Sequence, residues 1–127
     1  MAEHKRYEIS VTPKVTFLSE QSDPDKNHFV FAYTITVTNT GDVTAQLVSR
    51  HWIITDAEHR VQEVKGQGVV GKQPLLKPGE SFEYTSGASL PTAVGTMRGT
   101  YQMVAEDGHA FDAEIPIFTL SVPRTLH

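Results

Sequence analysis

Alternation of apolar and polar residues is the main pattern along this chain. It is clearest over residues 29–38, where the apolar positions are Phe29, Phe31, Tyr33, Ile35 and Val37. Successive side chains of a strand point to opposite faces, so this stretch predicts a strand with one buried and one solvated face. The turn-forming sequence Asn-Thr-Gly-Asp at residues 39–42 ends it.

The same alternation predicts further strands, at residues 7–17, 45–55, 60–64, 81–86, 96–103 and 111–122. Pro13 lies in the first of them and cannot donate to a ladder, so we place that strand at a sheet edge. In the last one, an apolar face of Phe111, Ala113, Ile115 and Ile117 changes phase after Pro116, which predicts a β-bulge. The sequence Lys-Pro-Gly-Glu at residues 77–80 suits a type II turn. No segment shows a helical period.

About seven short strands separated by turns predict an all-β fold, a two-sheet antiparallel sandwich of the immunoglobulin or fibronectin type III kind. At 127 residues we expect a single domain, residues 1–127. Trp52 lies in the predicted third strand, where such sandwiches often place a core tryptophan. Tyr101, two residues before Met103, fits either a tyrosine corner or an ordinary core aromatic residue.

Charge and composition exclude several classes of function. The formal net charge is −4, with 11 Lys and Arg against 15 Asp and Glu, so the chain lacks the basic field that non-specific nucleic-acid binding needs. It has no cysteine, which excludes thiolate metal sites and a cysteine nucleophile. No window approaches the length of an apolar membrane span, and the first residues do not look like a secretion signal. We therefore expect a cytoplasmic protein without membrane insertion.

A glycine-rich stretch, Gly-Gln-Gly-Val-Val-Gly at residues 66–71, matches the dinucleotide motif G-x-G-x-x-G. That motif works only before a helix, whose amino terminus holds the pyrophosphate, and the prolines at 74 and 78 leave no room for one. Two interpretations remain. The stretch is either a tight connection with Val69 and Val70 packed inside, or a nest of backbone N–H groups that binds phosphate or a nucleotide. The candidate binding residues of the second interpretation are Lys65, Gly66, Gly68, Gly71 and Lys72.

Other candidate chemistry is weak. Residues 23–27 begin like a calcium-binding EF-hand loop but lack its later glycine and glutamate. If residues 57–58 form the tip of a hairpin, His51 pairs with Val64 and lies roughly 17 Å along the strand from His59, too far to share a metal ion. No nucleophile elbow is present, because residues 87–91 lack its final glycine. We expect no catalytic residues, metal site or cofactor, and hence no enzyme.

Residues 50–123 resemble the ApaG family. The segments that carry the resemblance are Trp-Ile-Ile-Thr-Asp at 52–56, the glycine stretch at 66–71, Pro-Leu-Leu at 74–76, Pro-Gly-Glu-Ser-Phe-Glu-Tyr at 78–84, Ser-Gly at 86–87, Gly-Thr-Met-Arg-Gly-Thr-Tyr-Gln-Met at 95–103 and Ile-Pro-Ile-Phe at 115–118. One departure is Ala-Glu-His at 57–59, where we expect the family to carry a glycine.

The resemblance implies a fibronectin type III or immunoglobulin-like sandwich in a cytosolic bacterial protein, from a family whose name is tied to cobalt and magnesium resistance. It also implies a protein-binding role, because the domain occurs in larger eukaryotic proteins, including F-box proteins and a DNA polymerase-interacting protein. The family brings no catalytic residues, and its suggested nucleotide site would map to Gly66, Gly68 and Gly71. We expect a non-enzymatic protein-interaction module with an unidentified protein partner, any effect on divalent cations being indirect. Phosphate or nucleotide binding at residues 66–71 is the alternative.

Overall fold

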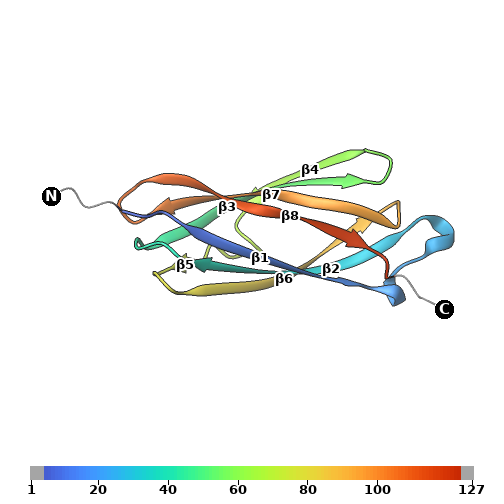
Figure 1. Cartoon of the computed structure of the whole chain (residues 1–127), viewed down its shortest axis with the longest axis horizontal. Coiled ribbons are helices and arrows are strands. Elements are labelled where there is room, and N and C mark those ends of the chain that lie inside the picture. The colour runs from blue at the N-terminus through green and yellow to red at the C-terminus, as the bar shows by residue number, and fades with distance from the viewer. Residues whose placement is uncertain (1–4, 124–127) are drawn as a thin grey trace.

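The computed structural model describes residues 5–123, which form two antiparallel sheets packed face to face (Figure 1). Two short 3-10 turns, η1 (Ser19–Gln21) and η2 (Pro24–Lys26), are the only helical elements in this part of the chain. The strands are β1 (Ile9–Phe17), β2 (Phe29–Asn39), β3 (Ala45–Asp56), β4 (Val61–Gln67), β5 (Leu75–Leu76), β6 (Ser81–Leu90), β7 (Val94–Ala105) and β8 (Ala110–Ser121).

The smaller sheet has the strand order β1-β2-β6, and the larger sheet has the order β4-β3-β7-β8, with β5 added beside β3. This confirms the predicted two-sheet antiparallel sandwich. β1 lies at an edge of the smaller sheet, as Pro13 predicted, and Pro13 pairs with Ile35. The turn at residues 77–80 also forms as predicted: Glu80 N–H donates to Lys77 O at 2.9 Å, and Gly79 has a φ of 86°.

The core lies between the sheets around Trp52, which is 2% exposed. Its ring contacts aromatic rings from both sheets, with centroid separations of 5.4 Å to Tyr33, 6.3 Å to Tyr101 and 5.9 Å to Phe118. All three contacts are edge-on, the geometry that ring quadrupoles favour. The alternating residues of β2 supply the facing layer and are fully or nearly fully buried: Phe31, Tyr33, Ile35 and Val37.

Two bulges change the phase of alternation. In β3 the register against β7 shifts between Leu47 and Ser49, so Leu47 and Trp52 both face the core although they are five residues apart. In β8 the register shifts beside Pro116, as predicted. The expectation that Ile117 shares the face of Ile115 is wrong, because the bulge precedes it and leaves its side chain 63% exposed.

Tyr101 joins the two sheets by a hydrogen bond between its hydroxyl and that of Tyr84. In a tyrosine corner the hydroxyl would bond to the backbone a few residues upstream, so that interpretation is wrong. Burial raises the pKa of both tyrosines, since the charged phenolate would lose its hydration there. The pair satisfies two polar groups that would otherwise be buried without partners.

The turn between β3 and β4 is longer than predicted. Thr55 pairs with Val61, and His51 pairs with Lys65 rather than with Val64. The Asp56 carboxylate organises this turn by accepting the backbone N–H groups of Glu58 and Arg60, at 2.8 and 3.1 Å, and the Arg60 guanidinium at 2.8 Å. Burial opposes ionisation of Asp56, but these hydrogen bonds outweigh it and hold its pKa below the usual value.

The two long sides of the sandwich differ. On one side β1 packs against β8, so the two sheets meet. On the other side β4 and β6 are the terminal strands of their sheets, and no comparable contact joins them within residues 5–123. The sandwich is therefore closed along one side and open along the other.

The segment that precedes β1 is held to the β7–β8 turn by Asp107. The Asp107 carboxylate accepts the Tyr7 hydroxyl at 2.6 Å, the backbone N–H of His109 at 3.0 Å and the Lys5 ammonium at 3.1 Å. The Tyr7 hydrogen bond, helped by that of His109, lowers the pKa of Asp107 to about 2.

This lowered pKa predicts a pH dependence of stability. Because folding favours the ionised carboxylate, its contribution is complete above pH of about 4 and is lost as the pH falls towards about 2. Asp107→Asn should flatten this part of the curve of unfolding free energy against pH, measured by urea denaturation. Asp112→Asn, an exposed site with the same change of charge, is the control. Equal acid dependence of the parent and Asp107→Asn would contradict the assignment.

Candidate functional site

The glycine-rich stretch is a continuation of the β3–β4 hairpin, anchored by Arg50. Gly66 pairs directly with Arg50, and the Arg50 guanidinium lies across the space where a side chain on Gly66 would be, 2.8 Å from the position of its Cβ. One guanidinium nitrogen of Arg50 donates to the carbonyl oxygens of Gln67 and Gly68, at 3.0 and 2.8 Å. Two backbone carbonyl groups of the stretch, those of Gln67 and Gly68, therefore point towards the positively charged Arg50 side chain.

Beyond Gly68 the chain makes a two-residue turn of type I′. Val69 and Lys72 exchange both backbone hydrogen bonds, at 2.8 and 2.9 Å, and the two residues between them, Val70 and Gly71, have φ values of 44° and 79°. This is the turn that matches the twist of a hairpin. Val69 is fully buried as predicted, whereas Val70 is 55% exposed, so the expectation that both valines pack inside is wrong for Val70.

The structure separates the predicted phosphate-binding residues. The N–H of Gly68 donates to Val48 O at 2.8 Å, and the N–H groups of Val69 and Lys72 are paired with each other's carbonyls. Within residues 5–123, the N–H groups of Val70 and Gly71 have no such partner. Lys65 lies opposite His51 in the larger sheet. Phosphate binding here stays a prediction, with Val70, Gly71 and Lys72 as the residues that remain available for it.

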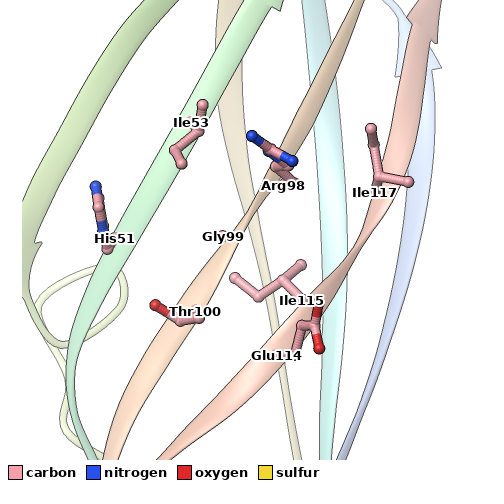
Figure 2. Close-up of a pocket in the computed structure, with 8 residues that line it drawn as sticks. All are labelled: His51, Ile53, Arg98, Gly99, Thr100, Glu114, Ile115 and Ile117. Atoms are coloured by element: carbon pink, nitrogen blue, oxygen red, sulfur yellow. The ribbon is translucent and has the colours of Figure 1, made fainter.

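The outer face of the larger sheet carries a shallow hollow across β3, β7 and β8 (Figure 2). Its lining residues are His51, Ile53, Arg98, Gly99, Thr100, Glu114, Ile115 and Ile117. Arg98 and Glu114 are both exposed, and neither has an ion-pair partner among the described residues. The hollow combines exposed apolar surface with one charge of each sign, a mixture suited to contact with another protein surface.

Exposed apolar residues gather on this same face. Of the six large hydrophobic residues that are exposed within residues 5–123, five point outwards from the larger sheet: Val61, Leu75, Val94, Val104 and Ile117. We call Val61, Val94 and Ile117, together with Ile53, the outer-sheet patch, whereas Leu75 and Val104 lie at the opposite end of the sheet. No signal in the sequence assigned this role to Ile117, because its exposure depends on the bulge at Pro116.

The outer face of the smaller sheet is different, because its polar side chains satisfy one another. Hydroxyl groups of β2 and β6 pair across the strands, Thr34 with Thr85 and Thr38 with Ser81, both at 2.7 Å. A threonine and a carboxylate complete the row, with Thr36 donating to Glu83 at 3.0 Å. A face that satisfies its own hydrogen bonds offers little to a partner.

The described residues contain no group of three His, Asp or Glu side chains placed to hold a metal ion. His51 lies on β3, and its Nε2 is 3.8 Å from a Glu63 carboxylate oxygen. His59 has a φ of 64° and lies in the β3–β4 turn, within the three residues where the family resemblance led us to expect a glycine. Across residues 5–123, no helix is both long enough and apolar enough to cross a membrane.

Known proteins resemble this chain over its whole length. A model of the ApaG domain matches residues 19–105. Proteins named Protein ApaG are 66% identical in Thiobacillus denitrificans and 65% identical in Dechloromonas aromatica, each over all 127 residues of both chains. A crystal structure of a Bordetella pertussis protein described as ApaA is 59% identical and superposes with a TM-score of 0.92, covering 95% of this chain and 98% of that one.

The positive φ values at Gly68 and Val70 predict opposite effects of substitutions at these two residues. Val70→Gly should raise the unfolding free energy by about 1 kcal/mol, because a β-branched residue is strained at positive φ and this one is largely exposed. Gly68→Ala should lower it, since the new Cβ would lie 2.3 Å from Lys72 O. Urea denaturation of both variants and the parent measures these changes. A loss of stability in Val70→Gly would mean that its side chain makes contacts worth more than the strain.

Proposed function

Because this chain belongs to the ApaG family, we propose that it is a non-enzymatic protein-interaction module that binds a protein partner through the outer-sheet patch. The observation that carries the proposal is the concentration of exposed apolar side chains on one face of the sandwich, with Val61 and Ile117 more than 60% exposed. Burying such residues at an interface gains hydrophobic free energy that a polar face cannot supply.

The arrangement of charges around the patch supports the same proposal. Arg98 and Glu114 flank the apolar residues and carry charges that are free to pair with a partner. Interfaces commonly combine an apolar centre with a polar rim that fixes orientation. We place the module in the cytoplasm. We propose that any effect on cobalt or magnesium resistance arises indirectly, through this protein partner.

The proposal predicts which surface variants lose the partner. Val61→Lys combined with Ile117→Lys should reduce partner capture from an extract of the protein's own cells at least tenfold, because each buried lysine would have to lose its hydration. Thr12→Lys combined with Thr16→Lys, on exposed positions of β1 in the smaller sheet, is the control with the same added charge. The readout is quantitative mass spectrometry of proteins crosslinked to each variant.

The control variant should retain the partner, and both double variants should melt as the parent does. Equal capture by all three proteins would overturn the assignment of the patch. Turnover of a small molecule by the purified chain, with no specific partner captured, would overturn the whole proposal.

A second candidate function is phosphate or nucleotide binding at residues 66–71, favoured by the free N–H groups of Val70 and Gly71 beside Lys72. If it is right, titration of the labelled protein with pyrophosphate or ATP, with and without magnesium, should give saturable amide shifts at residues 66–72. Lys72→Gln should weaken that response, because the loop would lose its adjacent positive charge. Absence of shifts in a folded sample would leave the stretch with its structural role alone.

A further inference from the structure

Along its open side the sandwich contains a groove between the two sheets, at positions that core side chains usually fill. It has a volume of about 300 Å³ and lies between β6 of the smaller sheet and the β3–β4 hairpin of the larger one. Its lining includes Arg50, Trp52, Gln62, Val64, Ser86 and Ala88. The inward positions of a sandwich are normally filled by large apolar side chains, so a hollow here needs an explanation.

Small and polar residues at inward positions create this groove. On β6 the inward row that begins with Phe82 and Tyr84 has only Ser86 and Ala88 before the buried Leu90. On β4, Gln62 lies on the same face as Val64. The corresponding inward positions on the closed side hold apolar residues, among them Val11, Ala113 and Ile115.

Arg50 supplies an unneutralised positive charge to the groove. Its side chain is partly buried and uses one guanidinium nitrogen for the carbonyl groups of Gln67 and Gly68. No carboxylate of the described residues lies within 4.0 Å of it, and within residues 5–123 its other two nitrogens have no acceptor. A partly desolvated guanidinium of this kind favours a carboxylate, which can accept two parallel hydrogen bonds from it.

Trp52 provides an independent indication that something is missing from the groove. The residue is 98% buried and lines the groove, and its indole N–H has no acceptor within the described residues. Buried N–H groups in folded proteins nearly always have a partner, so an unpaired one beside an open groove points to an acceptor that arrives from outside.

The edge of β6 is open to a further strand. β6 pairs only with β2 among the described strands, and its residues 84–90 include neither a charged residue nor a proline. Exposed edges usually carry such residues, because they block pairing with another chain. An extended peptide that pairs with this edge would point every second side chain into the groove.

We infer that the groove binds an extended acidic peptide segment, which adds to the edge of β6 and places an Asp or Glu carboxylate on the Arg50 guanidinium. A segment of about six residues, about 20 Å long, would span the groove side of β6. The inference rests on the proposed function only in that the ligand is part of a protein, and it assigns a second surface, separate from the outer-sheet patch.

A random 12-residue peptide library displayed on phage and selected on the full chain tests this inference. Selected peptides should share an Asp or Glu within a β-forming stretch. A synthetic copy of one such peptide should change the fluorescence of Trp52, the single tryptophan, on binding. Replacing its acidic residue with the matching amide should weaken binding at least tenfold, since the guanidinium would then face a neutral group.

Variants of the protein distinguish this groove from the rest of the surface. Arg50→Gln and, independently, Ala88→Leu should each weaken peptide binding at least tenfold, the first by removing the charge and the second by filling the groove. Lys14→Gln, at an exposed position of β1 in the smaller sheet, is the control with the same change of charge and should bind as the parent does. Thermal melting checks that each variant is folded. Ala88→Leu keeps Arg50, so it tests the groove even if the loss of Arg50 disturbs residues 66–71.

Several results would overturn the inference. They are the selection of no peptide, peptides without an acidic residue, or equal binding by the parent and Ala88→Leu. Acetate or inorganic phosphate that bound at Arg50 as tightly as the peptide would replace the peptide with a small anion. Loss of peptide binding in the Val61→Lys and Ile117→Lys protein, but not in Ala88→Leu, would move the peptide to the outer-sheet patch and leave the proposed function standing.

Discussion

Trp52 fills the space between the two sheets: its edge-on contact with Tyr33 ties the larger sheet to the smaller one, and its contacts with Tyr101 and Phe118 hold it within the larger sheet. The Tyr84–Tyr101 hydroxyl pair lies beside this cluster and bridges the sheets by a hydrogen bond. A sandwich of this size has one core, so the residues packed around this tryptophan decide whether each long side of the sandwich is closed or open. On the β1–β8 side, apolar residues continue outwards and the sheets close. On the β4–β6 side they give way to Arg50, Ser86 and Ala88, and the sheets stay apart.

This asymmetry separates the surfaces that contribute to stability from those available for binding. The outer face of the smaller sheet satisfies its own hydroxyl groups, and the β1–β8 side is packed. What remains is the outer-sheet patch on one face and the groove along the open side. Both contain features that are unfavourable in an isolated domain: exposed Val61 and Ile117 in the first, and in the second the Arg50 guanidinium, which has no carboxylate partner among the described residues. Such features cost stability in the free protein and are relieved when a partner covers them.

The sequence predicted the sandwich because alternation in strands such as β2 is strong and one face is clearly polar. It also predicted the edge position of β1 from Pro13 and the bulge at Pro116, since proline has few places in a sheet. The site could not be predicted in the same way. Arg50 faces the groove because the extra residue of β3 lies between Leu47 and Ser49, in a stretch where both faces are partly apolar and the alternation is ambiguous. The pairing of His51 was misplaced by one residue, because the turn that follows depends on Asp56 and on a positive φ at His59.

If the groove is open in solution, the neighbourhood of Trp52 is accessible to molecules from outside. Hydrogen exchange of the Trp52 indole N–H, followed as the single tryptophan indole resonance in the NMR spectrum, measures this accessibility. An open groove lets this proton exchange well before the backbone N–H groups of Tyr33 and Tyr101, whose exchange requires the sheets to unfold. Exchange as slow as that of those buried amides would mean that the groove is closed in solution and that no ligand reaches Trp52 through it.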